Sequence, residues 1–115
     1  MELTSEKEPK MLIVTVQEAR IDAASALQFK DEIRRVTEGG VDPVLLDLHH
    51  VEFIDSSGLG AIVAAMKHLA PERQLVLAGF TPTVEKVFKL TRMDTVFSIF
   101  SRVEDGIAAL QRKEA

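Results

Sequence analysis

The residues whose types could do chemistry gather in one short segment, Asp55-Ser56-Ser57-Gly58-Leu59-Gly60. A strand-like run ends at Leu48 and a helical pattern follows the segment; in parallel sheets, functional sites gather where strands end and helices begin. The first turn of a helix has unpaired N–H groups and a partial positive charge, so it attracts an anion. We therefore predict that Ser56 is a phosphorylation site, where a phosphate would add roughly 1.5 to 2 negative charges beside Asp55.

The competing interpretation of Ser56 is an ordinary helix cap, because Asp and Ser are both common there and either Asp55 or Ser56 could serve. Ser57 is interpreted as a structural residue or as a secondary acceptor. Gly58 and Gly60 lack the side chains that would keep another backbone or a phosphate away. One aspartate, two serines and two glycines together at a strand-to-helix junction favour the phosphorylation site over the plain cap.

The sequence does not predict an enzyme, and we assign no catalytic residues. A serine hydrolase would need a nucleophile elbow of the form G-x-S-x-G, but Ile54 and Asp55 precede Ser56. A phosphate-binding loop of the form G-x-x-x-x-G-K-[ST] is absent, so no nucleotide cofactor is expected. An Asp-Ser pair without a positioned histidine does not make a triad.

Metal binding is also not predicted. Cysteine is absent, and the three histidines, His49, His50 and His68, leave few options for a metal site. Adjacent residues on a strand point to opposite faces, so His49 and His50 are not expected to share one metal. His68 lies late in its helix, where a partly charged imidazole suits the helix dipole. We expect surface or packing roles for all three.

Hydrophobic periodicity predicts strands and helices in alternation. The expected strands lie at 12–16, 44–48, 74–78 and 96–100, with a short edge strand at 2–4 before a turn-like stretch at 5–10. The expected helices start near residues 26, 58, 82 and 103. The alanine-rich side of the second helix fits either core packing or a close partner. This order predicts an α/β fold with a mixed sheet of four to five strands and four to five helices.

Size and charge limit the function. A chain of 115 residues forms one domain, 1–115, with fraying expected at 1–10 and 112–115. The net charge is −4 and the basic residues are scattered, which argues against nucleic acid or an anionic membrane as the main partner. The longest apolar stretch, Leu59 to Met66, is too short to cross a bilayer, and the polar N-terminus does not resemble a secretory signal. We expect a cytoplasmic location without membrane insertion.

The segment EFIDSSGLGAIV, residues 52–63, closely resembles the signature of the STAS domain, and particularly that of the bacterial anti-sigma-factor antagonists. The resemblance extends from Met11 to about Leu110. It includes Arg20-Ile21-Asp22, the LLDL run and the segment VFKLTRMD. It implies a single STAS-like domain.

The resemblance implies that the protein binds an anti-sigma factor that is also a serine kinase of the histidine-kinase-like ATPase fold, and so frees the sigma factor. The kinase phosphorylates the first serine after the aspartate, here Ser56, and the complex separates. A metal-dependent phosphatase of the PP2C type restores the active form. Asp22 and Asp55 match family positions on the kinase-facing surface, and the other residues expected at this surface are Ser57, Gly58, Leu59 and Gly60.

The sequence departs from the family pattern at two places. Family members usually have glycine where this chain has Ala19 or Arg20, and the pair His49-His50 replaces a small or polar pair. Both departures are expected to alter the choice of partner. The alternative function is that of a STAS adaptor subunit of a membrane transporter or other assembly, in which Ser56 is never phosphorylated.

Overall fold

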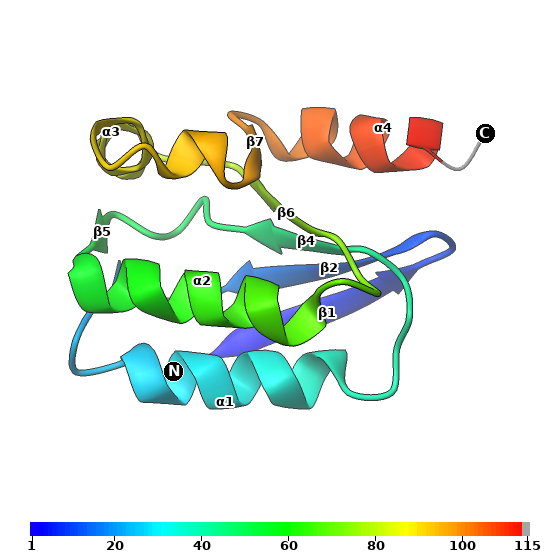
Figure 1. The fold of residues 1–115 in the computed structure, drawn as a ribbon, viewed down its shortest axis with the longest axis horizontal. Coiled ribbons are helices and arrows are strands. Elements are labelled where there is room, and N and C mark those ends of the chain that lie inside the picture. Colours follow the sequence, from blue (N-terminus) through cyan, green and yellow to red (C-terminus); the bar gives the residue numbers. More distant parts are fainter. Residues whose placement is uncertain (114–115) are drawn as a thin grey trace.

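A five-stranded sheet forms the centre of the part of the chain that the structure, a computed structural model, describes: residues 1–113. Its strands, in sheet order, are β1 (Leu3–Glu8), β2 (Met11–Val16), β4 (Val44–Asp47), β6 (Leu75–Ala78) and β7 (Ser98–Phe100) (Figure 1). β1 and β2 form an antiparallel hairpin, and every other neighbouring pair is parallel. The mixed sheet predicted from the sequence is confirmed.

Four α-helices and one short 3-10 helix complete the described part of the chain: α1 (Ala26–Thr37), α2 (Ser56–Leu69), α3 (Pro82–Leu90), η1 (Met93–Thr95) and α4 (Val103–Lys113). α1 and α2 run side by side on one side of the sheet, and α4 lies on the other (Figure 1). The predicted number of helices is confirmed. Within residues 1–113, no helix has the length and apolar character that a membrane span requires.

The residues of β4 alternate between two hydrophobic clusters, one on each face of the sheet. Val44 and Leu46 belong to the larger cluster, which α1, α2 and α3 complete. Leu45 belongs to the smaller cluster, which includes Leu110 of α4. All three side chains are fully buried. Burial on both faces explains why this strand has no alternation of polar and apolar residues.

The alanine-rich side of α2 packs within the molecule. Ala61 and Ala65 are 2% and 3% exposed, and Ala64 lies in the narrow cleft that α2 forms with Ile33 of α1. Small side chains let the two helices approach each other closely. Of the two interpretations of this side, core packing is therefore the one that the fold supports.

β1 is longer than the sequence predicted. We expected a strand at residues 2–4, a turn at 5–10 and fraying throughout 1–10, but pairing with β2 continues to Glu8 and only Pro9 and Lys10 form the turn. The strand lies at the sheet edge, so most of its side chains are exposed and polar. A polar edge strand has no apolar alternation, which is why the sequence pattern did not reveal it. At the other terminus, where we expected fraying at 112–115, residues 112 and 113 belong to α4 and 114–115 lie outside the described residues.

A second, two-stranded sheet lies in segments that we expected to be links. It pairs β3 (Arg20–Ile21) with β5 (Phe53–Ile54) in parallel. Strands of two residues are too short to give a periodic pattern, so the sequence did not predict them. β3 precedes α1 and β5 precedes α2, so this pairing brings the starts of the two helices together.

We expect Ile62→Ala to lower the free energy of unfolding by about 2–5 kcal/mol, because the fully buried side chain fills space between α2 and the sheet. Leu27→Ala is the control: Leu27 is 67% exposed, and its removal should change stability by no more than about 0.5 kcal/mol. Urea unfolding of both variants measures the difference. Equal losses of stability would contradict the described packing.

Candidate functional site

The Asp55 carboxylate connects the starts of α1 and α2. Asp55 is the N-cap of α2, and its Oδ1 accepts a hydrogen bond from the Gly58 amide at 2.9 Å. Its Oδ2 accepts from the amide of Ala23, in the loop before α1, at 3.0 Å. The sequence left open whether Asp55 or Ser56 caps the helix; the structure assigns the cap to Asp55.

Ser56 is the first residue of α2 and is exposed. Its hydroxyl makes no hydrogen bond within the described residues, and the same holds for the neighbouring Ser57. Both residues lie in the first helical turn, where backbone N–H groups have no intrahelical acceptor. Because Asp55 performs the capping, the Ser56 hydroxyl has no structural duty and is accessible from solvent.

Asp22 organises the loop that leads into α1. Its Oδ1 accepts hydrogen bonds from the Ala24 amide at 3.1 Å and from the Ser25 hydroxyl at 3.2 Å. Its Oδ2 accepts from Nε of Arg20 at 3.1 Å. The hydrogen bond from Arg20 is the main reason that the pKa of Asp22 lies below its ordinary value, and the bonds from Ser25 and Ala24 lower this pKa further. Asp22 is therefore an anion whose position is held by its neighbours.

The Arg20 guanidinium also lies over the ring of Phe53, 4.2 Å from its centroid. Arg20 and Phe53 are paired across β3 and β5, so the two side chains are neighbours in the small sheet. Phe53 is 38% exposed. We did not predict it as a site residue. The sequence signal that could have identified Phe53 is its position directly before Ile54. Neighbouring residues of a strand point to opposite faces, so burial of Ile54 turns Phe53 outward.

The two glycines of the segment have different roles. Gly58 is buried, and a Cβ there would overlap the carbonyl oxygen of Ile21 in β3. Gly60 is exposed, and apart from its chain neighbours and the backbone of its own helix, no atom of residues 1–113 lies within 4 Å of the position that its Cβ would take. The fold therefore explains Gly58, whereas no contact among the described residues requires glycine at position 60.

The structure brings most of the predicted surface residues together at one end of α1 and α2. Asp22 and Asp55 meet there, since Ala23, next to Asp22, donates to Asp55. The exposed part consists of Ser56, Ser57 and Gly60, with Asp22 and Asp55 half-buried beside them. Two predicted contact residues face inward instead, because Gly58 is buried and the half-buried Leu59 packs against the larger cluster.

His49 and His50 do not point to opposite faces, which corrects the prediction. They lie in a turn after β4, and their ring centroids are 3.8 Å apart. Nδ1 of His49 lies 2.8 Å from Oδ1 of the buried Asp47. Both histidines and His68 are exposed. Among residues 1–113, no group of three or more His, Asp or Glu residues could hold a metal ion.

A family profile identifies the class of protein. The STAS domain profile matches residues 2–106, which is most of the chain. The chain therefore belongs to the STAS domain family.

Relatives within this family are named anti-sigma factor antagonists. The chain is 30% identical over 112 residues to BtrV of Bordetella bronchiseptica, named as a candidate anti-sigma factor antagonist, with 96% of each chain covered. It is 35% identical over 82 residues to the anti-sigma-B factor antagonist of Listeria monocytogenes, with 69% of this chain and 70% of the relative covered.

Solved structures share the fold. An anti-sigma factor antagonist from Mycobacterium paratuberculosis superposes with a TM-score of 0.84 at 24% identity, over 96% of this chain and 93% of that chain. The Bacillus cell fate determinant SpoIIAA in its phosphorylated form superposes with a TM-score of 0.65 at 20% identity, over 95% of this chain and 99% of that chain.

The glycines give a paired prediction. We expect Gly58→Ala to lower the free energy of unfolding by about 1–3 kcal/mol, because the new methyl group must displace the Ile21 backbone. Gly60→Ala should raise it by about 0.5–1 kcal/mol, because alanine favours the helix and meets no atom. Urea unfolding measures both, and a destabilised Gly60→Ala variant would contradict the open space at this position.

The pKa of Asp22 gives a second prediction. We expect Arg20→Ala to raise this pKa, because the hydrogen bond that lowers it most is removed. A carboxyl whose pKa is lowered by folding stabilises the protein at pH values above its pKa in the unfolded chain. This stabilisation is lost as the pH falls through the pKa of the folded protein. In the variant, the free energy of unfolding should therefore depend less on pH in this range. NMR titration of the Asp22 carboxyl carbon measures the shift. Arg35→Ala is the control: it should raise the pKa of Glu32, its own partner, and leave Asp22 unchanged.

Proposed function

We propose that this protein is an anti-sigma-factor antagonist whose docking is switched off by phosphorylation of Ser56. In its unphosphorylated form it binds an anti-sigma factor at the surface formed by Ser56, Ser57, Gly60 and the carboxylates of Asp22 and Asp55. Binding frees the sigma factor. The family membership and the names of the relatives support the class of function.

One observation carries the choice of Ser56. Ser56 is exposed and its hydroxyl makes no hydrogen bond within residues 1–113, although serine at a helix start commonly accepts a hydrogen bond from the backbone as the cap. The cap is Asp55, so modification of Ser56 leaves the helix start intact. SpoIIAA, which has the same fold, is known in a phosphorylated form, which shows that this fold is compatible with a phosphate.

A phosphate at Ser56 has opposite effects on the fold and on an interface. In the free protein it gains from the positive end of α2, typically about 0.3–1 kcal/mol near a helix terminus. In a complex it places a dianion beside Asp55 where a neutral hydroxyl was docked, and an unpaired buried charge costs several kcal/mol. The modified protein therefore stays folded while its complex separates.

The partner supplies the chemistry in this proposal. The anti-sigma factor is also the serine kinase, of the histidine-kinase-like ATPase fold, so ATP belongs to it and this chain needs no cofactor. A phosphatase of the PP2C type reverses the modification. The protein itself acts as a non-enzymatic regulator, in the cytoplasm, without nucleic acid as a partner.

Intact mass of the protein purified from its own cells tests the acceptor. We expect one phosphate on the wild type and on Ser57→Ala, and none on Ser56→Ala. No phosphate under any growth condition would overturn the proposal and favour the unmodified adaptor of a transporter or other assembly. A phosphate retained in Ser56→Ala would assign the switch to another residue.

Binding to the captured anti-sigma factor tests the mechanism. Ser56→Asp should weaken binding at least about tenfold, which is about 1.4 kcal/mol, while its free energy of unfolding stays equal to or above that of the wild type. Gly60→Ala, which is expected to keep the fold intact, tests whether a small uncharged addition at the same surface also weakens binding. If Ser56→Asp binds like the wild type, charge at this position does not control docking.

A further inference from the structure

The outer face of the small sheet lies directly beside the proposed phosphorylation site. Ile21 of β3 and Ile54 of β5 point inward and are 0% and 4% exposed. Neighbouring residues of a strand point to opposite faces, so Arg20 and Phe53 point outward together. Asp55 follows Phe53 by two positions and is also extended, so it points to the same side about 7 Å further along the chain. This face therefore continues into the surface proposed for docking.

All six phenylalanines of the chain lie in the described part, and Phe53 is the one of them that is exposed. The other five are buried or half-buried. Single exposed apolar side chains are common and need no partner, so exposure alone assigns Phe53 no role. Its role is inferred from the groups that surround it.

Arg20 is held over one side of this ring. Its guanidinium carbon lies 4.2 Å from the Phe53 ring centroid, and its Nε donates to Oδ2 of Asp22 at 3.1 Å. Asp22 is itself held by the Ala24 amide and the Ser25 hydroxyl. Two neighbours thus restrain the Arg20 side chain, although it is 60% exposed. A restrained side chain loses less conformational freedom on binding than a free one.

The terminal nitrogens of Arg20 remain available to a partner. Neither Nη1 nor Nη2 has a hydrogen-bond partner within residues 1–113, because Asp22 is bound at Nε. The planar N–H donors of a guanidinium match the geometry of a carboxylate. The exposed end of Arg20 is therefore suited to a carboxylate from outside the molecule.

The charge changes sign along this face. Arg20 is positive beside Phe53, and the carboxylates of Asp22 and Asp55 follow toward the start of α2. A matching partner presents a carboxylate to Arg20, an apolar side chain to Phe53 and a basic group to the two carboxylates. In the reverse orientation the same partner would bring like charges together, so the pattern fixes the direction of docking. Arginine and aromatic residues are also enriched in the cores of protein interfaces.

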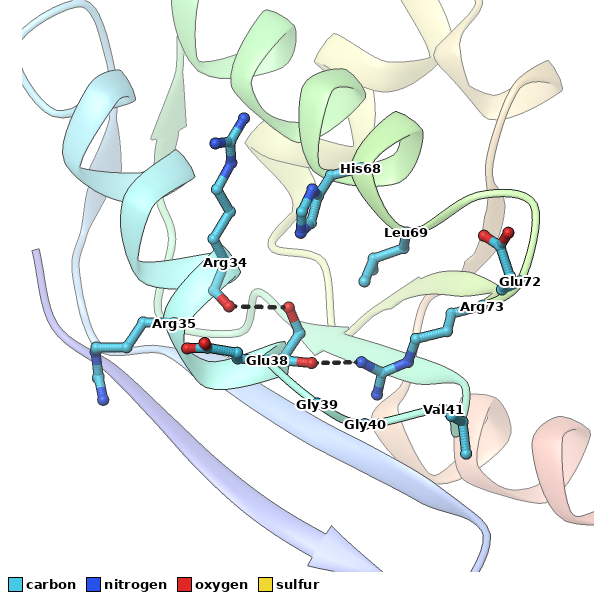
Figure 2. Close-up of a pocket in the computed structure, with 11 residues that line it drawn as sticks. Arg34, Arg35, Glu38, Gly39, Gly40, Val41, His68, Leu69, Glu72 and Arg73 are labelled. Carbon is cyan, nitrogen blue, oxygen red and sulfur yellow. Dashed lines mark hydrogen bonds between the residues drawn. The ribbon is translucent and has the colours of Figure 1, made fainter.

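The hollow at the other ends of α1 and α2 offers no comparable match. It has a volume of about 670 Å³, and Arg34, His68 and Arg73 are among the residues that line it. In Figure 2 the Arg73 guanidinium lies beside Gly39 and Gly40, and the Arg34 guanidinium points away from it. These charged groups do not converge on one ligand, in contrast to the connected side chains of the small sheet.

We propose that Arg20 and Phe53 are the specificity-determining contacts of the docking surface, and that the anti-sigma factor meets them with a carboxylate beside an apolar side chain. This inference rests on the proposed function, because it adds contacts to the same surface. The partner's carboxylate accepts hydrogen bonds from Nη1 and Nη2 of Arg20, and its apolar side chain covers the exposed part of the Phe53 ring. Ser56 controls whether the complex forms, whereas Arg20 and Phe53 select the anti-sigma factor that fits.

The test is calorimetric titration with the purified anti-sigma factor that the unphosphorylated wild type captures. Phe53→Ala and Arg20→Gln should each weaken binding at least about tenfold. Arg20→Glu should weaken binding further, because it sets a carboxylate against a carboxylate. Arg35→Gln is the matched control: it removes the same charge in the last turn of α1, where Arg35 points away from Arg73 (Figure 2), and should bind like the wild type. A cooperative urea transition checks that each variant is folded.

The outcomes separate this inference from the proposed switch. If Phe53→Ala and Arg20→Gln bind like the wild type while Ser56→Asp binds weakly, the inference is wrong and the switch stands. Tighter binding by Arg20→Glu than by Arg20→Gln would show a basic partner group at this position and would also overturn the inference. Equal losses in Arg20→Gln and Arg35→Gln would attribute the effect to net charge, with the same consequence. If the wild type binds no anti-sigma factor, the proposed function and this inference fail together.

Discussion

The carboxylate of Asp55 accepts one hydrogen bond from the first turn of α2 and one from the loop before α1. The small sheet of β3 and β5 brings these segments together, and Gly58 permits the close contact because it has no Cβ against Ile21. These features are linked, since a shift of α2 relative to α1 would break the bond from Ala23, whereas the bond from Gly58 is local to the start of α2. The geometry of the whole surface therefore depends on the buried Gly58 and on the Asp55 carboxylate.

In the proposed switch, this arrangement separates the structural role of Asp55 from the regulatory role of Ser56. Asp55 holds the backbone, Ser56 is left accessible, and Ser57 is equally exposed beside it. A serine that capped its own helix would exchange its hydroxyl cap for a phosphate when modified. With an aspartate as the cap, the proposed addition and removal of a phosphate on Ser56 would leave the cap of α2 in place. The proposed reversible docking requires this property.

The sequence predicted the parts of the fold that have strong periodic patterns. β4 and β6 are buried runs, and α1, α2 and α3 have apolar stripes with clear starts, so each was predicted near its observed position. β3, β5 and most of β1 were missed, because two-residue strands and polar edge strands are defined by pairing rather than by their own composition. The fold also corrects the histidine pair, because the alternation of a strand was applied to His49 and His50, which lie in a turn after β4.

The candidate site was predictable in its residue types but not in its geometry. The segment from Asp55 to Gly60 pointed to Ser56, yet only the fold separates the buried Gly58 from the exposed Gly60. Phe53 and Arg20 acquire their relation through β-pairing across more than thirty positions of sequence. Arg34, His68 and Arg73 come to line one hollow in the same way. Contacts between residues this far apart in sequence form only in the assembled fold, so local sequence patterns do not predict them.

α1 and α2 lie in the same direction, so their positive ends coincide at one edge of the molecule and their negative ends at the other (Figure 1). Two aligned helix dipoles repel each other, and the charges at their ends offset this: carboxylates at the start, and Arg34, Lys67 and His68 in the last turns. Each end therefore carries side-chain charge opposite in sign to the partial charge of the helix dipoles, and any steering of a partner by these charges would weaken once salt shortens their range to about 8 Å.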